Sequence, residues 1–416
     1  MLRKTVFWLH LAAGVTAGLV IAIMAFTGTT IAFEKEILAW AERDVRRIEP
    51  PPDAERLPFS EILQRARATA PELKLTGASL YSNPAVAVTA TFGRDEMYYI
   101  NPYSGDVRPS TARSIRDFLH FMESVHRQLG FTSAALKPTG RALTGACNGA
   151  FLFLTISGLY LWWPRHWSWR GVKAVAVLNV RLFGRARDFH WHNVIGLWAA
   201  PALIVLTLTA LPMSYRWADA LVYRITGTSP KVQESVPRTP ASPAGAALPG
   251  RGTKRPGYDD FLAKVQSEIP DWTEITFRLS AGRGAGNAPL DATAKTGTGT
   301  RPSGIERERH AAPGDQPRGA QTVNVTVRGS NQWPLFSATT FALDSSTGAI
   351  LNKDIFADQN AGRRLRSWAR FLHTGEALGW PGKLTAALAA LGALILVWTG
   401  FALAYRRLFS RRQPAI

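Results

Sequence analysis

Four long apolar stretches alternate with polar segments along the chain. The stretches cover roughly residues 6–33, 143–163, 193–215 and 384–405. Each has about 20 residues or more, the length of helix that crosses about 30 Å of hydrocarbon. The pattern predicts four membrane-spanning helices in the ranges 1–33, 139–163, 190–216 and 373–405. The polar segments are then 34–138, 164–189, 217–372 and a tail at 406–416.

The two long polar segments have the patterns of small α+β modules. In 34–138, a helical stretch at about 58–70 precedes β-favouring runs and a strand–turn–strand pattern from Tyr98 to Val107. The second segment, 217–372, has a helix and then strands at about 258–268, 274–279 and 322–328. Because the order of span, module and span occurs twice, we interpret the chain as an internal duplication of about 200 residues.

An insert at 281–319 interrupts the second module. It is rich in Gly, Ala and Thr and poor in strand-forming residues. Such a composition cannot bury enough apolar surface to offset the entropy of ordering, so we expect the insert to be disordered.

The location of the charges predicts a topology and argues against a nucleic-acid partner. The net charge is +19, and the excess gathers at Arg3 and Lys4, in the segment 165–187, and from Arg406 onward. The two long segments are closer to charge balance. By the positive-inside rule, both termini and the middle loop are cytoplasmic and the two modules lie outside. No basic patch interleaved with aromatic residues marks a nucleic-acid site.

The first span and the single cysteine further limit the class of protein. The N-terminal apolar run is longer than the core of a signal peptide and lacks a clear cleavage site, so we interpret it as a retained signal anchor. The chain has one cysteine, Cys147, which excludes an intramolecular disulfide and the covalent attachment of a c-type haem.

Four histidines recur at matched places relative to the spans. His10 and His192 begin outward-running spans, each four residues before a glycine. His126 and His373 precede inward-running spans, near the outer face. We call His10 and His192 the inner pair, and His126 and His373 the outer pair.

These pairs match the requirement of one cofactor. A b-type haem without covalent links needs two imidazoles from different helices, on opposite faces of the porphyrin. Ionisable residues in membrane segments are usually functional. We therefore predict two b-type haems whose irons are bound by the inner and the outer pair. The alternatives are polar side chains at headgroup level and a metal site, for which carboxylate or cysteine ligands are missing.

Each pair has an alternative ligand. His190 and His192 are about 200° apart on a helix, so both cannot face one haem. We prefer His192 because it keeps the four-residue step to glycine. His126 is preferred to His120 because it lies nearer the span, and His120 is expected to be an outer-surface residue or a substrate-side contact.

Small residues and arginines accompany the pairs. Small residues at the far ends of the spans indicate either close helix packing or room for a macrocycle edge: Thr27-Gly28, Ser157-Gly158 and Thr399-Gly400. Five arginines beside the outer pair are candidates for haem propionate or anionic substrate contacts, the alternative being ordinary solvated charge: Arg127, Arg363, Arg364, Arg366 and Arg370.

In this order the motifs resemble the PepSY-associated transmembrane (PepSY-TM) family of bacterial inner-membrane proteins. The resemblance covers nearly the whole chain and rests on Leu9-His10, Thr27-Gly28, Val125-His126, Ser157-Gly158, His192, Leu372-His373-Thr374-Gly375, Thr399-Gly400, and the module ends at 101–105 and 344–348. Ala210, at the place of the span glycine, and the insert at 281–319 depart from the pattern.

The resemblance implies a fold and a function. The fold is an α-helical membrane protein with four transmembrane helices and two periplasmic PepSY-like α+β modules. Its location is the bacterial inner (cytoplasmic) membrane, with several passes and both termini cytoplasmic. The implied function is that of a di-haem oxidoreductase that reduces a periplasmic ferric siderophore and releases iron. No further catalytic residue is assigned.

The electron donor and two rival functions stay open at this point. No nucleotide fingerprint lies between a strand and a helix, so the donor is expected to be a membrane quinol or a separate reductase. One rival is a non-enzymatic PepSY protein that regulates or binds a periplasmic peptidase or an uptake system. The other is a quinol-linked b-type cytochrome with a different acceptor. The partners expected in any case are the lipids of the bilayer.

Overall fold

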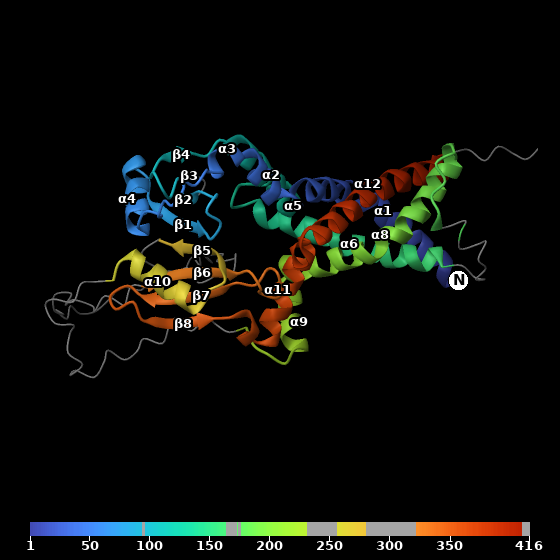
Figure 1. Cartoon of the computed structure of the whole chain (residues 1–416). Coiled ribbons are helices and arrows are strands. Elements are labelled where there is room, and N and C mark those ends of the chain that lie inside the picture. Colours follow the sequence, from blue (N-terminus) through green and yellow to red (C-terminus); the bar gives the residue numbers. More distant parts are fainter. Residues whose placement is uncertain (94–95, 164–172, 174–175, 231–255, 280–321, 410–416) are drawn as a thin grey trace, which may run out of the picture.

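Four helices form a bundle at one end of the molecule (Figure 1). The computed structural model describes residues 1–93, 96–163, 173, 176–230, 256–279 and 322–409. In this part, four helices are long and apolar enough to cross a membrane: α1 (Leu2–Ile31), α6 (Lys137–Trp162), α8 (Gly184–Ser214) and α12 (Gly379–Phe409). α1 and α8 each pack against both α6 and α12. The prediction of a multi-pass membrane protein is confirmed.

Small residues bring the helices of the bundle close together. Ala199 and Ala393 are buried at the contact of α8 with α12, and a Cβ added at Gly392 would lie 3.3 Å from the Cβ of Ala199. A Cβ at Gly18 of α1 would lie 2.8 Å from the ring of Phe401 on α12. Because lipid gives little hydrophobic drive between helices, such close packing supplies much of the association energy.

The strands form one antiparallel sheet. The first group of elements comprises α4 (Phe59–Thr69), β1 (Leu75–Tyr81), β2 (Val88–Phe92), β3 (Glu96–Ile100) and β4 (Val107–Pro109). The second comprises α10 (Tyr258–Glu268), β5 (Trp272–Arg278), β6 (Thr322–Gly329), β7 (Thr339–Asp344) and β8 (Ile350–Asp354). The strand order is β4-β3-β2-β1-β5-β6-β7-β8. The predicted helices near 58–70 and 258–268 are confirmed as α4 and α10.

The two predicted modules meet at the pair β1–β5. Ala78 pairs with Phe277 across this joint, and the hydroxyls of Ser79 and Thr276 lie 2.8 Å apart. Without this pairing, both strands would expose unpaired backbone N–H and C=O groups. The sheet therefore continues from one module into the other.

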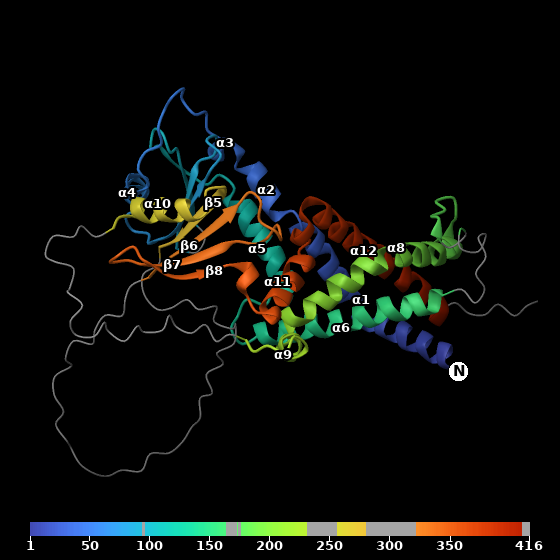
Figure 2. The ribbon, with the colours of Figure 1, turned by 60° about the horizontal axis from the view of Figure 1, so that its bottom comes forward.

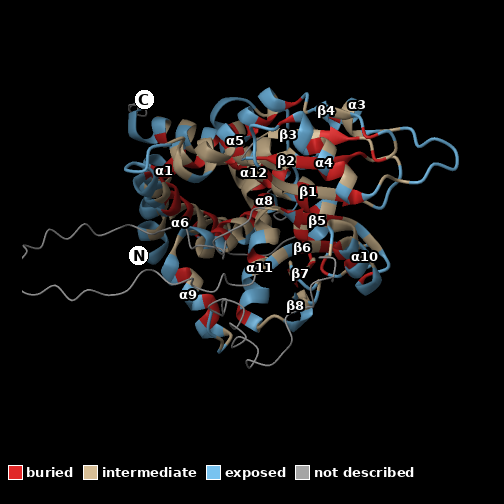
Figure 3. Ribbon diagram, turned by 90° about the vertical axis from the view of Figure 1, so that its left-hand side faces the viewer, coloured by how far each residue is buried: buried red, intermediate tan, exposed pale blue. Residues whose placement is uncertain are grey.

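One core lies under both covering helices. Phe59 of α4 and Val265 of α10 belong to the same buried cluster as Phe92, Phe277 and Phe341 from the strands. Their rings and side chains are almost fully buried, and Figure 3 shows the buried residues gathered in the strands beside α4. Because the cluster draws on both modules, the core as a whole spans the β1–β5 joint.

Two further helices lie between the sheet and the bundle, α5 (Arg113–Gln128) and α11 (Ala361–His373) (Figure 2). α5 packs against α1 and α6, and α11 packs against α8. Gly375 and Gly379 have positive φ angles of 76° and 65°, which separate α11 from α12. His373 therefore ends α11, and the long helix of the fourth span begins at Gly379.

Three short helices complete the junction between sheet and bundle: α2 (Glu34–Ala41), α3 (Arg43–Arg46) and α9 (Arg216–Ile225). The N-terminus lies at the end of the bundle away from the sheet (Figure 2). We call this the far end, and the other the sheet end. The predicted insert at 281–319 and much of the predicted loop at 164–189 lie outside the described residues.

Candidate paired-histidine sites

The inner pair lies toward the far end of the bundle. His10 comes from α1 and His192 from α8, and their ring centroids are 6.4 Å apart with planes at 83°. His10 Nδ1 lies 2.8 Å from Ser157 Oγ on α6, and His192 Nδ1 lies 2.9 Å from Thr399 Oγ1 on α12. All four long helices thus contribute to this site.

The hydroxyl at His192 defines which imidazole nitrogen is available. Thr399 Oγ1 donates its proton to the carbonyl of Ile395 at 2.7 Å, so it accepts a hydrogen bond from His192 Nδ1–H. A neutral imidazole protonated at Nδ1 has its lone pair at Nε2. Nε2 is therefore the nitrogen that can bind a metal, and the threonine fixes the ring orientation.

The outer pair has the same arrangement at the sheet end. His126 on α5 and His373 on α11 have ring centroids 6.3 Å apart, with planes at 52°. His126 Nδ1 lies 2.9 Å from the carbonyl of Met24 on α1, and His373 Nδ1 lies 2.8 Å from the carbonyl of Leu206 on α8. Because a carbonyl can only accept, both Nδ1 atoms carry the proton and both Nε2 atoms keep a lone pair.

The imidazoles of the outer pair are neutral. Burial lowers the pKa of His126 to about 4, and the neighbouring His373 adds to this shift. Burial also lowers the pKa of His373. Both residues lie on helices outside the membrane-spanning segments. At neutral pH both rings are therefore in the form that binds a metal ion.

Glycines make room for three of the four rings. A Cβ at Gly28 would lie 3.2 Å from Cε1 of His126, one at Gly158 would lie 3.4 Å from Cε1 of His10, and one at Gly400 would lie 3.5 Å from Cε1 of His192. The sequence left two explanations for these glycines, helix packing or space for a macrocycle. The structure gives a third role, because the glycines accommodate the imidazoles.

The distance between the two ring centroids of each pair can be compared with the distance expected when two imidazoles bind one metal ion. An imidazole nitrogen binds a transition metal at about 2.0–2.1 Å, and two rings on opposite sides of one ion then have centroids about 6.3–6.5 Å apart. Both pairs have this spacing. Among the described residues, no three His, Cys, Asp or Glu side chains gather as a metal site. The spacing is compatible with two axial imidazoles on one metal ion, whose remaining ligands would then come from a macrocycle.

The alternative histidines lie outside the pairs. His190 Nε2 accepts a hydrogen bond from the backbone N–H of Asn179 at 2.9 Å. It is turned toward the chain segment before α8 and away from His10. His120 is exposed on α5 and interacts electrostatically with Glu34. The structure thus brings together the four preferred histidines and neither alternative.

Most of the candidate arginines already have partners. Three form ion pairs, Arg127 with Glu123 at 2.8 Å, Arg363 with Asp354 at 2.6 Å and Arg366 with Asp219 at 2.6 Å. Arg370 lies over the ring of Phe371, and Arg364 is exposed on α11. Within the described part of the chain, Arg364 and Arg370 are exposed and form no ion pair with a carboxylate, so they are the better candidates for contacts with an anionic ligand.

Sequence reasoning missed the two carbonyl acceptors of the outer pair. Met24 and Leu206 act through their backbone, so their side chains give no sign of the role. A positional signal existed, because Met24 follows His10 at the same interval as Leu206 follows His192. That register, applied to the two spans, would have indicated equivalent acceptors.

The comparisons with known proteins agree with the helices and motifs. Residues 7–407 match the family model described as the PepSY-associated TM region. Comparison with curated proteins gives no match. Because the match covers nearly the whole chain, including both histidine pairs, the chain belongs to the PepSY-associated TM family.

Proposed function

We propose that the protein is an inner-membrane b-type di-haem oxidoreductase that reduces a periplasmic ferric siderophore. The observation that carries this proposal is the recurrence of one site geometry at two depths. Each pair has two imidazoles spaced for one metal, with the Nδ1 of its histidines engaged by a hydroxyl or a carbonyl. A regulatory or binding protein has no need of two such sites.

His10 and His192 would hold one haem, and His126 and His373 the other. A haem bound at each pair supplies one-electron transfer between the ferric and ferrous states of its iron. The protein orients the ligands through Nδ1, which fixes the rings and raises their basicity as donors. It also keeps the outer imidazoles neutral by burying them.

The interior of the bundle between the two sites is closely packed and largely apolar. Ile21 and Cys147 pack in one buried cluster, and Leu203 and Ala393 in a second. Each of these side chains is at most 7% exposed. The proposed electron path from the inner to the outer pair would run through this packed interior.

The orientation follows from the charges at the far end. Arg3 and Lys4 begin α1, and Arg406 and Arg407 end α12, on the side away from the sheet. Basic residues flank the cytoplasmic ends of spans. We therefore propose that the far end is cytoplasmic and that the sheet is periplasmic.

We also propose that the chain arose by internal duplication. The order of a helix, four strands, a second helix and a long helix recurs as α4, β1–β4, α5, α6 and as α10, β5–β8, α11, α12. Equivalent carbonyls, Met24 and Leu206, bond to the two outer histidines. Under this proposal, each pair contains one histidine from each half.

The substrate would meet the protein at the sheet end, beside the outer pair. Arg364 and Arg370 give this end exposed positive charge, which attracts an anionic ferric chelate. Siderophores hold Fe(III) through hard oxygen ligands. Reduction to Fe(II) weakens that hold and releases the iron.

The absorption spectrum of the purified protein tests the proposal. After expression with sufficient haem, we expect a Soret band and about two haems per chain. His126→Ala and His373→Ala should each remove about half of the haem. His120→Ala is the matched control on α5 and should remove none. A wild-type preparation without a Soret band would refute the proposed function.

Iron release requires a second assay. Reduced protein is mixed with several ferric chelates, and Fe(II) is trapped by a ferrous-specific dye. Release that disappears in His373→Ala supports the siderophore reductase. A haem protein that reduces none of the chelates would be a cytochrome with another acceptor.

A further inference from the structure

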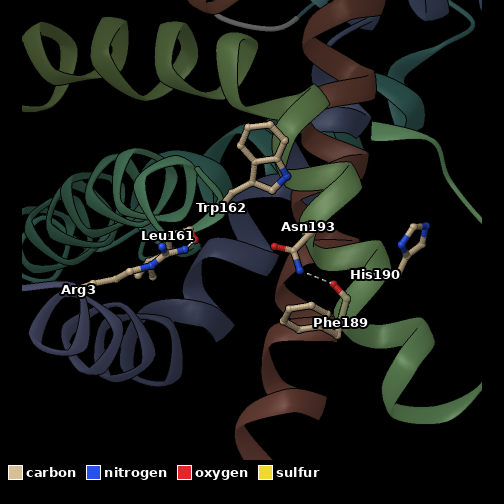
Figure 4. A pocket seen from close by; sticks show the side chains of 6 residues that line it. All are labelled: Arg3, Leu161, Trp162, Phe189, His190 and Asn193. Atoms are coloured by element: carbon tan, nitrogen blue, oxygen red, sulfur yellow. Dashed lines mark hydrogen bonds between the residues drawn. The ribbon is translucent and has the colours of Figure 1, made fainter. Parts of the chain in front are cut away.

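A pocket lies at the far end of the bundle, where Arg3 begins α1, and Figure 4 shows the side chains that line it. Its volume is about 230 Å³. It lies between α1, α6 and α8, and its lining residues are Arg3, Leu161, Trp162, Phe189, His190 and Asn193.

Helical periodicity places this pocket next to the inner pair, one to two helical turns away. Arg3 precedes His10 by two helical turns, so the two share one face of α1. Leu161 follows Ser157, the hydrogen-bond partner of His10, by one turn on the same face of α6. Phe189 precedes His192 by one turn on α8. Three helices thus bring neighbours of the inner site to the wall of the pocket.

The lining is suited to a ring with a polar edge. Three of the six lining residues, Leu161, Trp162 and Phe189, are apolar or aromatic. Asn193 donates its Nδ2 hydrogen bond to the carbonyl of Phe189 at 2.7 Å. This bond fixes the amide, and its oxygen is directed toward the pocket (Figure 4).

Arg3 supplies a donor on the opposite side. Its guanidinium donates to the carbonyl of Leu161, which holds the side chain across the ends of α1 and α6. A guanidinium has five N–H groups, so others can donate to a ligand. The pocket therefore offers an acceptor from Asn193 and a donor from Arg3, with aromatic surface between them.

We propose that this pocket binds the ring of a membrane hydroquinone and is the electron entrance of the protein. The inference rests on the proposed function, because it assigns the electron donor of the inner site. The volume is sufficient for one substituted ring. The phenolic hydroxyl donates to the amide oxygen of Asn193. Arg3 donates to the ring oxygen on the other side.

The chemistry balances without a further reactant. A hydroquinone that becomes a quinone loses two electrons and two protons. The two irons of the proposed cofactors, held by the inner and the outer pair, would take one electron each. The protons leave to the water at the far end, where the pocket opens. The apolar tail of the quinol stays in the lipid that surrounds the bundle.

The test uses full-length protein in lipid nanodiscs, with decylubiquinol as the electron donor. The variants are Asn193→Leu and Phe189→Ala, with Phe183→Ala as the control for Phe189, since Phe183 is also exposed near the start of α8. Arg3→Gln is compared with Lys4→Gln, which makes the same change of charge one residue away.

Three readouts separate the possible results. Haem content and reduction by dithionite report the cofactor sites. Quinol-driven reduction of the Soret and α bands reports the entrance. Quenching of tryptophan fluorescence by oxidised decylubiquinone reports ring binding, independently of electron transfer.

We expect every variant to keep its haem content and its reduction by dithionite. Asn193→Leu, Phe189→Ala and Arg3→Gln should each slow quinol-driven reduction by about tenfold and weaken quenching, since each removes a hydrogen bond or aromatic contact with the ring. The two control variants should behave as the wild type.

The contrary results are distinct. Pocket variants that keep the wild-type rate, or a wild-type protein that no quinol reduces, would overturn the inference and leave the proposed function standing. Loss of haem in Arg3→Gln would assign the pocket to the macrocycle and also overturn it. A wild-type protein without haem would refute the proposed function and, with it, the role of the pocket as an electron entrance.

Discussion

A buried ion pair positions the helix that carries His126. Glu42, between α2 and α3, is 3% exposed, and its partner Arg116 on α5 is 7% exposed. Arg116 Nη2 lies 2.7 Å from Glu42 Oε1. Glu42 also accepts hydrogen bonds from the hydroxyls of Tyr99 and Ser110. The perturbation that we consider is Arg116→Met, which keeps much of the side-chain volume and removes the charge.

The magnitude follows from burial. Removing one partner of a buried pair leaves the other charge without compensation, which costs about 3–5 kcal/mol. The same helix offers a matched control. Arg113 lies 2.7 Å from Glu96, but its side chain is 68% exposed. An exposed pair contributes about 0–1 kcal/mol, so Arg113→Met should change stability little.

Denaturant titration in detergent, followed by tryptophan fluorescence, measures the free energy of unfolding. We expect Arg116→Met to lower it by several kcal/mol and Arg113→Met by less than about 1 kcal/mol. Because the double variant Glu42→Gln, Arg116→Met has no unpaired charge, it should be more stable than Arg116→Met alone. Equal losses in Arg116→Met and Arg113→Met would refute the reasoning, since burial would then not set the cost.

Three further predictions concern single groups. Thr399→Val removes the hydroxyl that orients the inner pair, so haem titration should show about 10–100-fold weaker binding at one site, while Thr209→Val should show none of this loss. A Cβ at Gly28 would press on an outer imidazole at 3.2 Å, so Gly28→Ala should lower haem content, whereas Gly149→Ala, with no atom within 4 Å, should not. Burial raises the pKa of the Tyr99 hydroxyl in the folded protein. The contribution of this hydroxyl to the free energy of unfolding is therefore fully present below about pH 10, the pKa of a free tyrosine, and is lost as the pH rises through the raised pKa. Unfolding measured from pH 8 to 11 should show a smaller alkaline loss in Tyr99→Phe than in the wild type.

The pattern of apolar residues predicted the helices whose buried or lipid-facing side chains recur regularly along the sequence. The four long helices and the helices α4 and α10 follow from periodicity and length. A helix repeats every 3.6 residues, which also showed that His190 and His192 cannot share a site. The four-residue step to glycine favoured His192, and in the structure His192 lies beside His10 while His190 bonds to the backbone of Asn179.

Long-range backbone contacts were not predictable in this way. The pair β1–β5 joins strands far apart in sequence, and the register of Ala78 with Phe277 has no side-chain signature. The side chain of Met24 likewise gives no sign that its carbonyl accepts a hydrogen bond from His126, and only its spacing from His10, which Leu206 repeats after His192, could have indicated the role. The separate helix α11 was also missed as a boundary, because the break at Gly375 falls inside a stretch that is otherwise compatible with the span.

The distribution of the histidines along the chain affects the order in which the sites can be completed. During synthesis, His10 and His192 are both present once α8 is made, but Thr399, which orients His192, arrives only with α12. The outer pair is complete only when His373 on α11 has been made, because His126 comes much earlier in the chain. A chain that stops before α11 therefore lacks His373 in the outer pair and Thr399 beside His192, so both sites are complete only after the last two long helical segments are made.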